Sequence, residues 1–105
     1  MAFPVSAALL DACVLAVLSR GEAYGYILTQ HIKSVIDLSE STLYPVLRRL
    51  QRDGLLSTFD RPFGGRNRRY YAITDRGLDA LRGYWDEWSA YKNSIDQILL
   101  GDDQT

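Results

Sequence analysis

Arginine is concentrated in one third of this chain, and arginine is suited to contacts with phosphate and with guanine. Residues 48–82 hold nine arginines and four aspartates, which sum to +5. Residues 1–47 sum to −2 and residues 83–105 to −4, so the three parts return the formal net charge of −1. The planar guanidinium binds phosphate and guanine through two parallel hydrogen bonds. A segregated cationic segment is therefore compatible with nucleic-acid binding, although the whole chain is nearly neutral.

The first part of the cationic segment is predicted to form a helix with polar residues on its outer side. Apolar residues recur at helical spacing on the inner side: Leu43, Val46, Leu47 and Leu50. The candidate DNA contacts lie outward or sideways: Ser41, Thr42, Tyr44, Arg48, Arg49 and Arg52. Ser39 is the expected N-cap. Ser41 is the alternative, because Pro45 lacks a backbone donor and distorts a helix that begins earlier.

The second part of the segment is predicted to form a hairpin. The runs Leu55–Phe59 and Arg68–Ile73 are rich in residues that favour strands, and Gly64-Gly65 lies in the loop between them. The tip offers further candidate DNA contacts: Arg66, Asn67, Arg68 and Arg69. Such a cationic tip is suited to holding the phosphate backbone rather than to reading bases.

The remaining elements are helices that position these two parts. Helices are predicted over residues 5–19 and about 23–34, and a long one over Asp75–Leu99 with Thr74 as its cap. Three helices followed by a two-stranded hairpin is the order of a winged helix-turn-helix. The predicted fold class is α+β and mostly helical. The winged helix-turn-helix covers residues 1–74, a dimerisation helix covers 75–100, and 101–105 is a flexible tail.

The last helix carries more apolar surface than a small domain needs. Its length of roughly 37 Å exceeds what the rest of the chain can cover. Its seam follows heptad spacing, interrupted by one lysine: Leu78, Leu81, Trp85, Trp88, Lys92, Ile95 and Leu99. We predict that this seam packs against a second copy. Trp85 and Trp88 can either form the core of that dimer or sandwich a planar ligand.

Four motifs together resemble the PadR family of transcriptional regulators. They are Tyr24-Gly25-Tyr26, the run Ser41–Leu50, Asp53-Gly54-Leu55 and the run Gly65–Thr74, and the resemblance extends over about residues 5–100. It implies a homodimeric, sequence-specific DNA-binding regulator that acts as a repressor. The single C-terminal helix is similar to a compact subgroup that includes the multidrug-sensing repressor of lactic acid bacteria.

Membership of that subgroup would imply a ligand site in the dimer. A tryptophan from each copy lines a central pore that stacks flat aromatic molecules, and Glu87-Trp88-Ser89 matches its position. Trp85 falls where the relative has another aromatic residue. The first helix would close the pore, which adds Ala7, Leu10 and Asp11 as candidates. Lys92 replaces an acidic residue, so a preference for cationic ligands does not carry over. Asp11 and Lys92 both interrupt apolar faces, and we expect them to pair.

The sequence argues against an enzyme. One histidine and one cysteine cannot supply the usual ligands of a structural zinc site, and no acid–base constellation or cofactor motif is present. His31 is expected in the core or at its boundary, and Cys13 as a small core residue. With a single cysteine and no apolar run near ~18 residues, we expect a cytoplasmic protein. The alternative function is a winged-helix module that binds a protein partner and senses no ligand.

Overall fold

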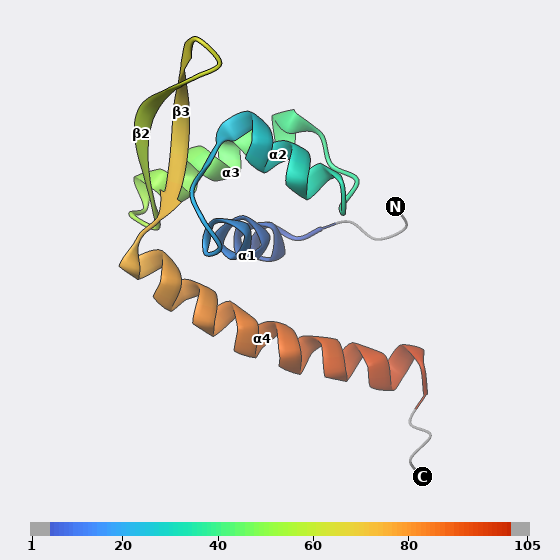
Figure 1. The fold of residues 1–105 in the computed structure, drawn as a ribbon. Helices are drawn as coiled ribbons and strands as arrows, with labels where there is room; N and C mark the ends of the chain where they lie inside the picture. The colour runs from blue at the N-terminus through green and yellow to red at the C-terminus, as the bar shows by residue number, and fades with distance from the viewer. Residues whose placement is uncertain (1–4, 102–105) are drawn as a thin grey trace.

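The computed structural model describes residues 5–101. Short helices lie beside a protruding hairpin (Figure 1). The order is α1 (Ala7–Leu18), β1 (Ala23–Tyr24), α2 (Gly25–Lys33), α3 (Glu40–Arg52), β2 (Leu56–Phe63), β3 (Arg66–Ile73) and α4 (Asp75–Leu99). Helix α4 runs along the far side of α1, and its C-terminal end projects away from the body (Figure 1). This arrangement confirms the predicted winged helix-turn-helix with a long last helix. The predicted tail at residues 102–105 lies outside the described residues.

The hairpin is confirmed, but its strands are longer than predicted and a third strand joins it. The sheet is antiparallel with the order β1-β3-β2. Gly64 and Gly65 form the two-residue turn with φ of 62° and 79°, the left-handed pair that a type I′ turn requires. Ala23–Tyr24, predicted to open the second helix, is instead extended and pairs with Tyr71 and Tyr70. A local helical pattern cannot reveal this pairing, because the partner strand lies almost 50 residues later.

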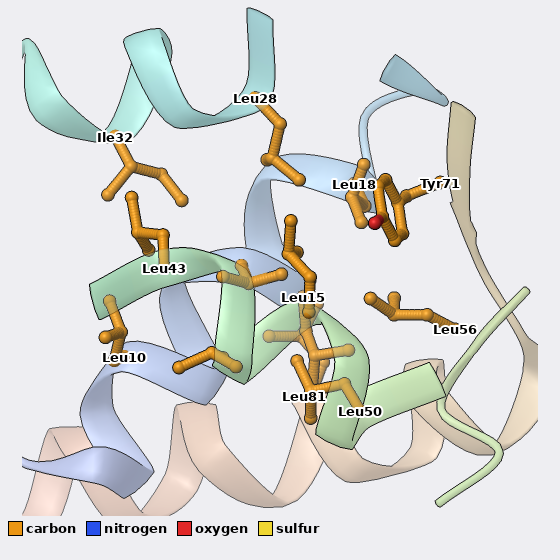
Figure 2. Close-up of a cluster of buried hydrophobic side chains, with 13 residues drawn as sticks. Leu10, Leu15, Leu18, Leu28, Ile32, Leu43, Leu50, Leu56, Tyr71 and Leu81 are labelled. Atoms are coloured by element: carbon orange, nitrogen blue, oxygen red, sulfur yellow. The ribbon is translucent and has the colours of Figure 1, made fainter. Parts of the chain in front are cut away.

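The core draws on every helix and on the base of the sheet (Figure 2). The four inward residues predicted for α3 are all buried. In α2, Leu28 and Ile32 are buried and Ile27 is exposed; His31, predicted in the core or at its boundary, is exposed as well. The helix is turned so that Thr29 faces inward, where its hydroxyl donates to the Gly25 carbonyl. Because this bond satisfies the hydroxyl, the polar side chain of Thr29 can be buried in the core.

The start of α3 settles the choice between the two caps in favour of Ser39, which is extended while Glu40 opens the helix. The Ser39 hydroxyl does not cap a backbone amide; it bonds the hydroxyls of Ser41 at 2.9 Å and Thr42 at 3.0 Å. The Thr42 amide donates to the Ser39 carbonyl three residues back, which is the tighter geometry of a 3₁₀ turn. Pro45 is the sixth residue of this helix, which continues through it to Arg52.

Helix α4 is anchored by its first turns. The Thr74 hydroxyl accepts from the Gly77 amide at 3.1 Å and donates to the Gly54 carbonyl at 2.7 Å. A Cβ atom on Gly77 would lie 2.3 Å from the Leu55 carbonyl oxygen, so only glycine allows this approach. Leu81 is 1% exposed. No helix within residues 5–101 combines the length and apolar character needed to cross a bilayer.

Candidate nucleic-acid interface

Helix α3 presents one continuous polar stripe to solvent. Ser41, Pro45, Arg48 and Arg52 follow each other at steps of four, three and four, so they share a face, and all four are exposed. The hydroxyl group cluster of Ser39, Ser41 and Thr42 lies at the helix N-terminus. Within the described residues, Arg48 has no carboxylate partner. The stripe therefore offers hydrogen-bond donors and at least one uncommitted guanidinium.

The N-terminus of α3 is held against the end of α2. The Lys33 ammonium lies 3.6 Å from a Glu40 carboxylate oxygen, and the Gln30 side-chain amide donates to the same oxygen at 3.3 Å. Leu28 and Ile32 of α2 pack in the same core as Leu43 of α3. These contacts fix the angle between the two helices and so the direction in which the α3 stripe faces.

Arg49 differs from Arg48 although the two are adjacent, because neighbouring residues on a helix lie 100° apart. Its guanidinium donates two hydrogen bonds to Asp11 of α1, at 3.1 Å and 2.5 Å. The bond to Asp11 is the main reason that the pKa of Arg49 is raised above its ordinary value. The Asp11 side chain is only 10% exposed. Arg49 thus stabilises a buried carboxylate and is not free for DNA in this arrangement.

The expected Asp11–Lys92 pair does not form. The Lys92 ammonium instead lies 3.0 Å from a carboxylate oxygen of Asp96, one turn further along α4. Sequence spacing placed both residues on apolar faces, but it could not show that Asp11 points toward α3. The partner of Asp11 comes from 38 residues along the chain.

The strand register divides the predicted wing-tip contacts between two faces, because side chains alternate along a strand. In the register Arg66 lies opposite Phe63 and Arg68 lies opposite Arg61, so Arg66 and Arg68 share a face with Arg61. Asn67 and Arg69 lie on the other face, opposite Pro62 and Asp60. The same face carries Thr58, which accepts a hydrogen bond from Gln51 of α3 at 3.2 Å. Of the four predicted wing-tip contacts, only Asn67 and Arg69 therefore lie on the side of the wing that faces α3.

Arg48 and Arg69 act on the same buried phenol. Burial raises the pKa of Tyr71, and the positive charges of Arg69 and Arg48 partly oppose that rise. The half-buried Tyr44 also interacts with Tyr71. We call the surface formed by the α3 stripe together with Asn67 and Arg69 the α3–wing surface.

Several arginines of the cationic segment already have carboxylate partners. Within residues 5–101, five of the nine lie 3.6 Å or less from a carboxylate: Arg49, Arg52, Arg61, Arg69 and Arg82. The Arg69–Asp60 pair is 3.6 Å long and about 60% exposed on both sides. Exposed pairs of this kind contribute about 0–1 kcal/mol, so phosphate can replace the partner. The buried Asp11–Arg49 pair is the exception.

The face of the wing away from α3 is stiffened by rings and guanidinium groups. Arg61 lies over the rings of Phe59 and Tyr70, with 5.0 Å and 4.8 Å from its central carbon to the ring centroids. Arg68 lies 5.0 Å over Tyr24 in the same way. Arg61 also pairs with Glu22 at 3.0 Å. These contacts hold Arg61 and Arg68 on the side of the wing opposite α3.

A mostly apolar groove of about 1150 Å³ separates α1 from the C-terminal half of α4. We call it the α1–α4 groove. Helix α1 contributes Ala8, Leu9 and Ala12, with Ser6 before it. Helix α4 contributes a longer wall: Tyr84, Glu87, Trp88, Tyr91, Lys92, Ile95, Asp96, Ile98 and Leu99. The Trp88 and Tyr91 rings lie 6.3 Å apart between centroids.

The groove contains Trp88 but none of the four other predicted ligand contacts. Leu10 is 3% exposed and Asp11 7% exposed, so both belong to the core. Trp85 and Ala7 are exposed outside the groove. On α1 the groove is lined by Ala8, Leu9 and Ala12 rather than by the predicted residues. Ala8 and Ala12 share a face at i and i+4, and that spacing was visible in the sequence.

The described residues contain no group of three His, Cys, Asp or Glu side chains that could hold a metal ion. Cys13 is half-buried, and burial raises the pKa of its thiol. A raised pKa keeps the thiol protonated and weakens its reactivity.

Comparison with known proteins agrees with this geometry. A model of the PadR-like transcriptional regulator family matches residues 14–83. Transcriptional regulator Rv3488 of Mycobacterium tuberculosis is 44% identical over 85 residues, covering 80% of this chain and 77% of that protein. The structure of smu.1704 from Streptococcus mutans has a TM-score of 0.89 and 44% identity, over 96% of this chain and 95% of that one.

A further similar structure was determined with nucleic acid. Bacillus subtilis PadR in complex with operator DNA has a TM-score of 0.66 and 26% identity, and the match covers 73% of this chain and 47% of that one. The family match spans α2, α3, the whole sheet and the anchored start of α4. The chain therefore belongs to the PadR-like family of transcriptional regulators, which are not enzymes, as its sequence predicts.

Proposed function

We propose that the protein is a sequence-specific DNA-binding regulator that acts as a homodimer. The observation that carries this proposal is the α3–wing surface, where the exposed polar stripe that contains Arg48 lies on the same side as Asn67 and Arg69 of the wing. Helix α3 would be the recognition helix and enter the major groove, with Ser41, Thr42, Tyr44, Arg48 and Arg52 within reach of bases and phosphates. Asn67 and Arg69 would hold the backbone beside it. The structure of the related B. subtilis protein was determined in complex with operator DNA, which supports DNA as the ligand of this chain.

The second copy would pack on the exposed seam of α4. Trp85, Trp88 and Leu99 are all exposed in the single chain, although they continue the spacing of the anchored first turns. Large apolar side chains gathered on one helix mark an interaction surface. Residues 1–74 would then form the DNA-binding domain and 75–100 the dimerisation helix. Two recognition helices would contact successive major grooves, roughly 34 Å apart, and read a pseudo-palindromic operator.

In the dimer, the α1–α4 groove would form part of the interface, because Trp88, Lys92, Ile95 and Leu99 belong both to its wall and to the seam, and it would accept a planar aromatic molecule against Trp88. Its size falls near the upper end of ordinary ligand pockets, which span about 300–1000 Å³. Trp88 and Tyr91 supply ring faces. The charged residues of its wall are Lys92, which pairs with Asp96, and Glu87. Binding would shift the dimer toward a spacing that no longer fits the operator, so the regulator would act as a ligand-released repressor. A regulator that binds an operator on the chromosome would act in the cytoplasm.

The direct test is fluorescence anisotropy with duplexes from the DNA upstream of the chain's own coding sequence. The native protein should bind one segment at least about 1000-fold more tightly than random duplex. Arg48→Ala should weaken that binding by about tenfold or more, because one base or phosphate contact is lost. Arg20→Ala is the matched control: it removes an equally exposed cation between α1 and β1, on no part of the α3–wing surface.

A steep fall of affinity with salt should accompany specific binding, because cations released from DNA drive the association. Equal affinity for all duplexes would contradict the proposal, and so would equal effects of Arg48→Ala and Arg20→Ala. The exposed tryptophans favour one second candidate, a module that binds a protein partner through α4. Salt-independent behaviour with no preferred duplex would support that candidate.

A further inference from the structure

The Asp11–Arg49 pair joins the helix that lines the groove to the proposed recognition helix. In the six other ion pairs between described residues, both side chains are at least 35% exposed. The Asp11 side chain is 10% exposed and meets Arg49 through two hydrogen bonds. An unpaired carboxylate at this depth would be strongly unfavourable, so α3 must follow Asp11 when α1 moves.

Helix α1 and Tyr84 each contribute both to the groove and to the surroundings of the pair. Ala8 and Ala12, which line the groove, lie three residues before and one residue after Asp11. Tyr84 lines the groove from α4. Its pKa is raised by burial and then by the negative charges of Asp11 and Glu87, so the phenol responds to the Asp11 charge. Anything that displaces α1 or Tyr84 from inside the groove therefore acts on Asp11.

We propose that the Asp11–Arg49 pair is the positioning contact that transmits groove occupancy to the recognition helix. The inference rests on the proposed function and deepens it. A planar aromatic molecule that fills the groove moves α1. Asp11 then pulls on the rigid guanidinium of Arg49, and α3 turns. Arg48, the next residue, lies on the α3 stripe and loses its place at the DNA. Arg49 thus acts through its neighbour and not by touching DNA.

The test fills the groove by substitution, so that it needs no identified ligand. Ala8→Trp places an indole on the groove wall. Ala7→Trp is the matched control, because Ala7 is equally exposed, one position earlier in the same helix turn, and outside the groove. With the native pair, Ala8→Trp should weaken operator binding about tenfold. Ala7→Trp should change it less than about twofold, because it leaves the groove open.

Both substitutions are then repeated in the Asp11→Leu/Arg49→Met variant, where apolar residues replace the pair and the fold is expected to survive. The effect of Ala8→Trp should shrink to less than about twofold there, because the link is gone. Arg49→Lys serves as a second background that keeps the charge but loses the fork, and the effect should shrink to about threefold. Thermal melts confirm that each variant folds, and sedimentation equilibrium confirms that each remains a dimer, because the groove shares Trp88, Lys92, Ile95 and Leu99 with the proposed seam.

A tenfold effect of Ala8→Trp that persists in both backgrounds would overturn the inference, since the signal would then bypass the pair. An Ala8→Trp variant that binds the operator like the native protein would overturn it as well, because the groove would not be coupled to α3. In both cases specific operator binding by the native protein leaves the proposed function standing. Absence of any specific binding by the native protein would overturn the proposed function, and this inference with it.

Discussion

The two halves of α4 follow the same apolar spacing but meet different surroundings. In the first half, Gly77 and Leu81 are buried against the sheet and α1. In the second half, Trp85 is 55% exposed and Leu99 66% exposed. The body cannot cover both halves, because the helix of 25 residues extends beyond it and gives the molecule a long axis of 60 Å against 29 and 20 Å. One heptad pattern therefore serves two interfaces, one within the chain and one that we assign to its copy.

The difference shows what a periodic seam can and cannot tell. Period alone predicted that all seven seam residues, Leu81 among them, would contact a second copy. The structure places Leu81 at 1% exposure within the chain's own core, so it offers no surface to a partner. Leu78, half-buried, lies in the same anchored half. The dimer seam that we propose therefore begins near Trp85.

The largest expected effect comes from shortening the same residue type in each half. Leu81→Ala removes a fully buried side chain and should lower the free energy of unfolding by about 2–5 kcal/mol. Leu99→Ala should leave protomer folding within about 0.5 kcal/mol and weaken only dimerisation, because its side chain is exposed in the single chain. Urea denaturation at several protein concentrations separates the two quantities. Equal losses for both variants, independent of concentration, would erase the distinction between the halves.

A smaller effect is expected from the two glycines of α4. In Gly77→Ala the new Cβ would meet the Leu55 carbonyl at 2.3 Å, and the shift that relieves this clash should cost about 1–3 kcal/mol. Gly83→Ala meets nothing within 4 Å and should stabilise the helix by about 0.5–1 kcal/mol. Thermal melting of the pair gives the sign of each change. If Gly77→Ala were neutral, the first half would not be anchored as described.

The smallest effect concerns Tyr84, where the two halves meet. Burial and the charges of Asp11 and Glu87 raise the pKa of its phenol. A raised pKa in the folded state means that stability is fully present below pH ~10 and is lost as pH rises through the folded pKa. Tyr84→Phe should therefore lose less stability than the native protein between pH 9 and pH ~11, and the contribution of Tyr71, whose pKa is also raised, is the same in both proteins. Parallel pH curves would place Tyr84 away from the acidic groups.

Most of the fold was predictable from local signals. The bounds of α4, the Thr74 cap and the inward residues of α3 follow from spacing and capping chemistry, and the structure confirms them. The start of α2 was not predictable in this way. Tyr24 is extended because it pairs with Tyr70, a contact that has no local signature.

The candidate site was predictable as a set of residue types but not as a surface. The sequence offers Arg48 and Arg49 as equivalent cations, and only the fold shows that Asp11 takes the second. It likewise offers four residues at the wing tip, and only the register separates Asn67 and Arg69 from Arg66 and Arg68. Both distinctions depend on contacts between distant parts of the chain, which composition and periodicity cannot supply.

The central claim is that the exposed half of α4 joins two copies of the chain, so that two α3–wing surfaces act together. Sedimentation equilibrium of the native protein at micromolar concentration tests it most directly. The account predicts a mass of twice the 11.9 kDa of one chain, and a shift toward the single-chain mass on Trp88→Asp. A native protein that sediments at 11.9 kDa would contradict it.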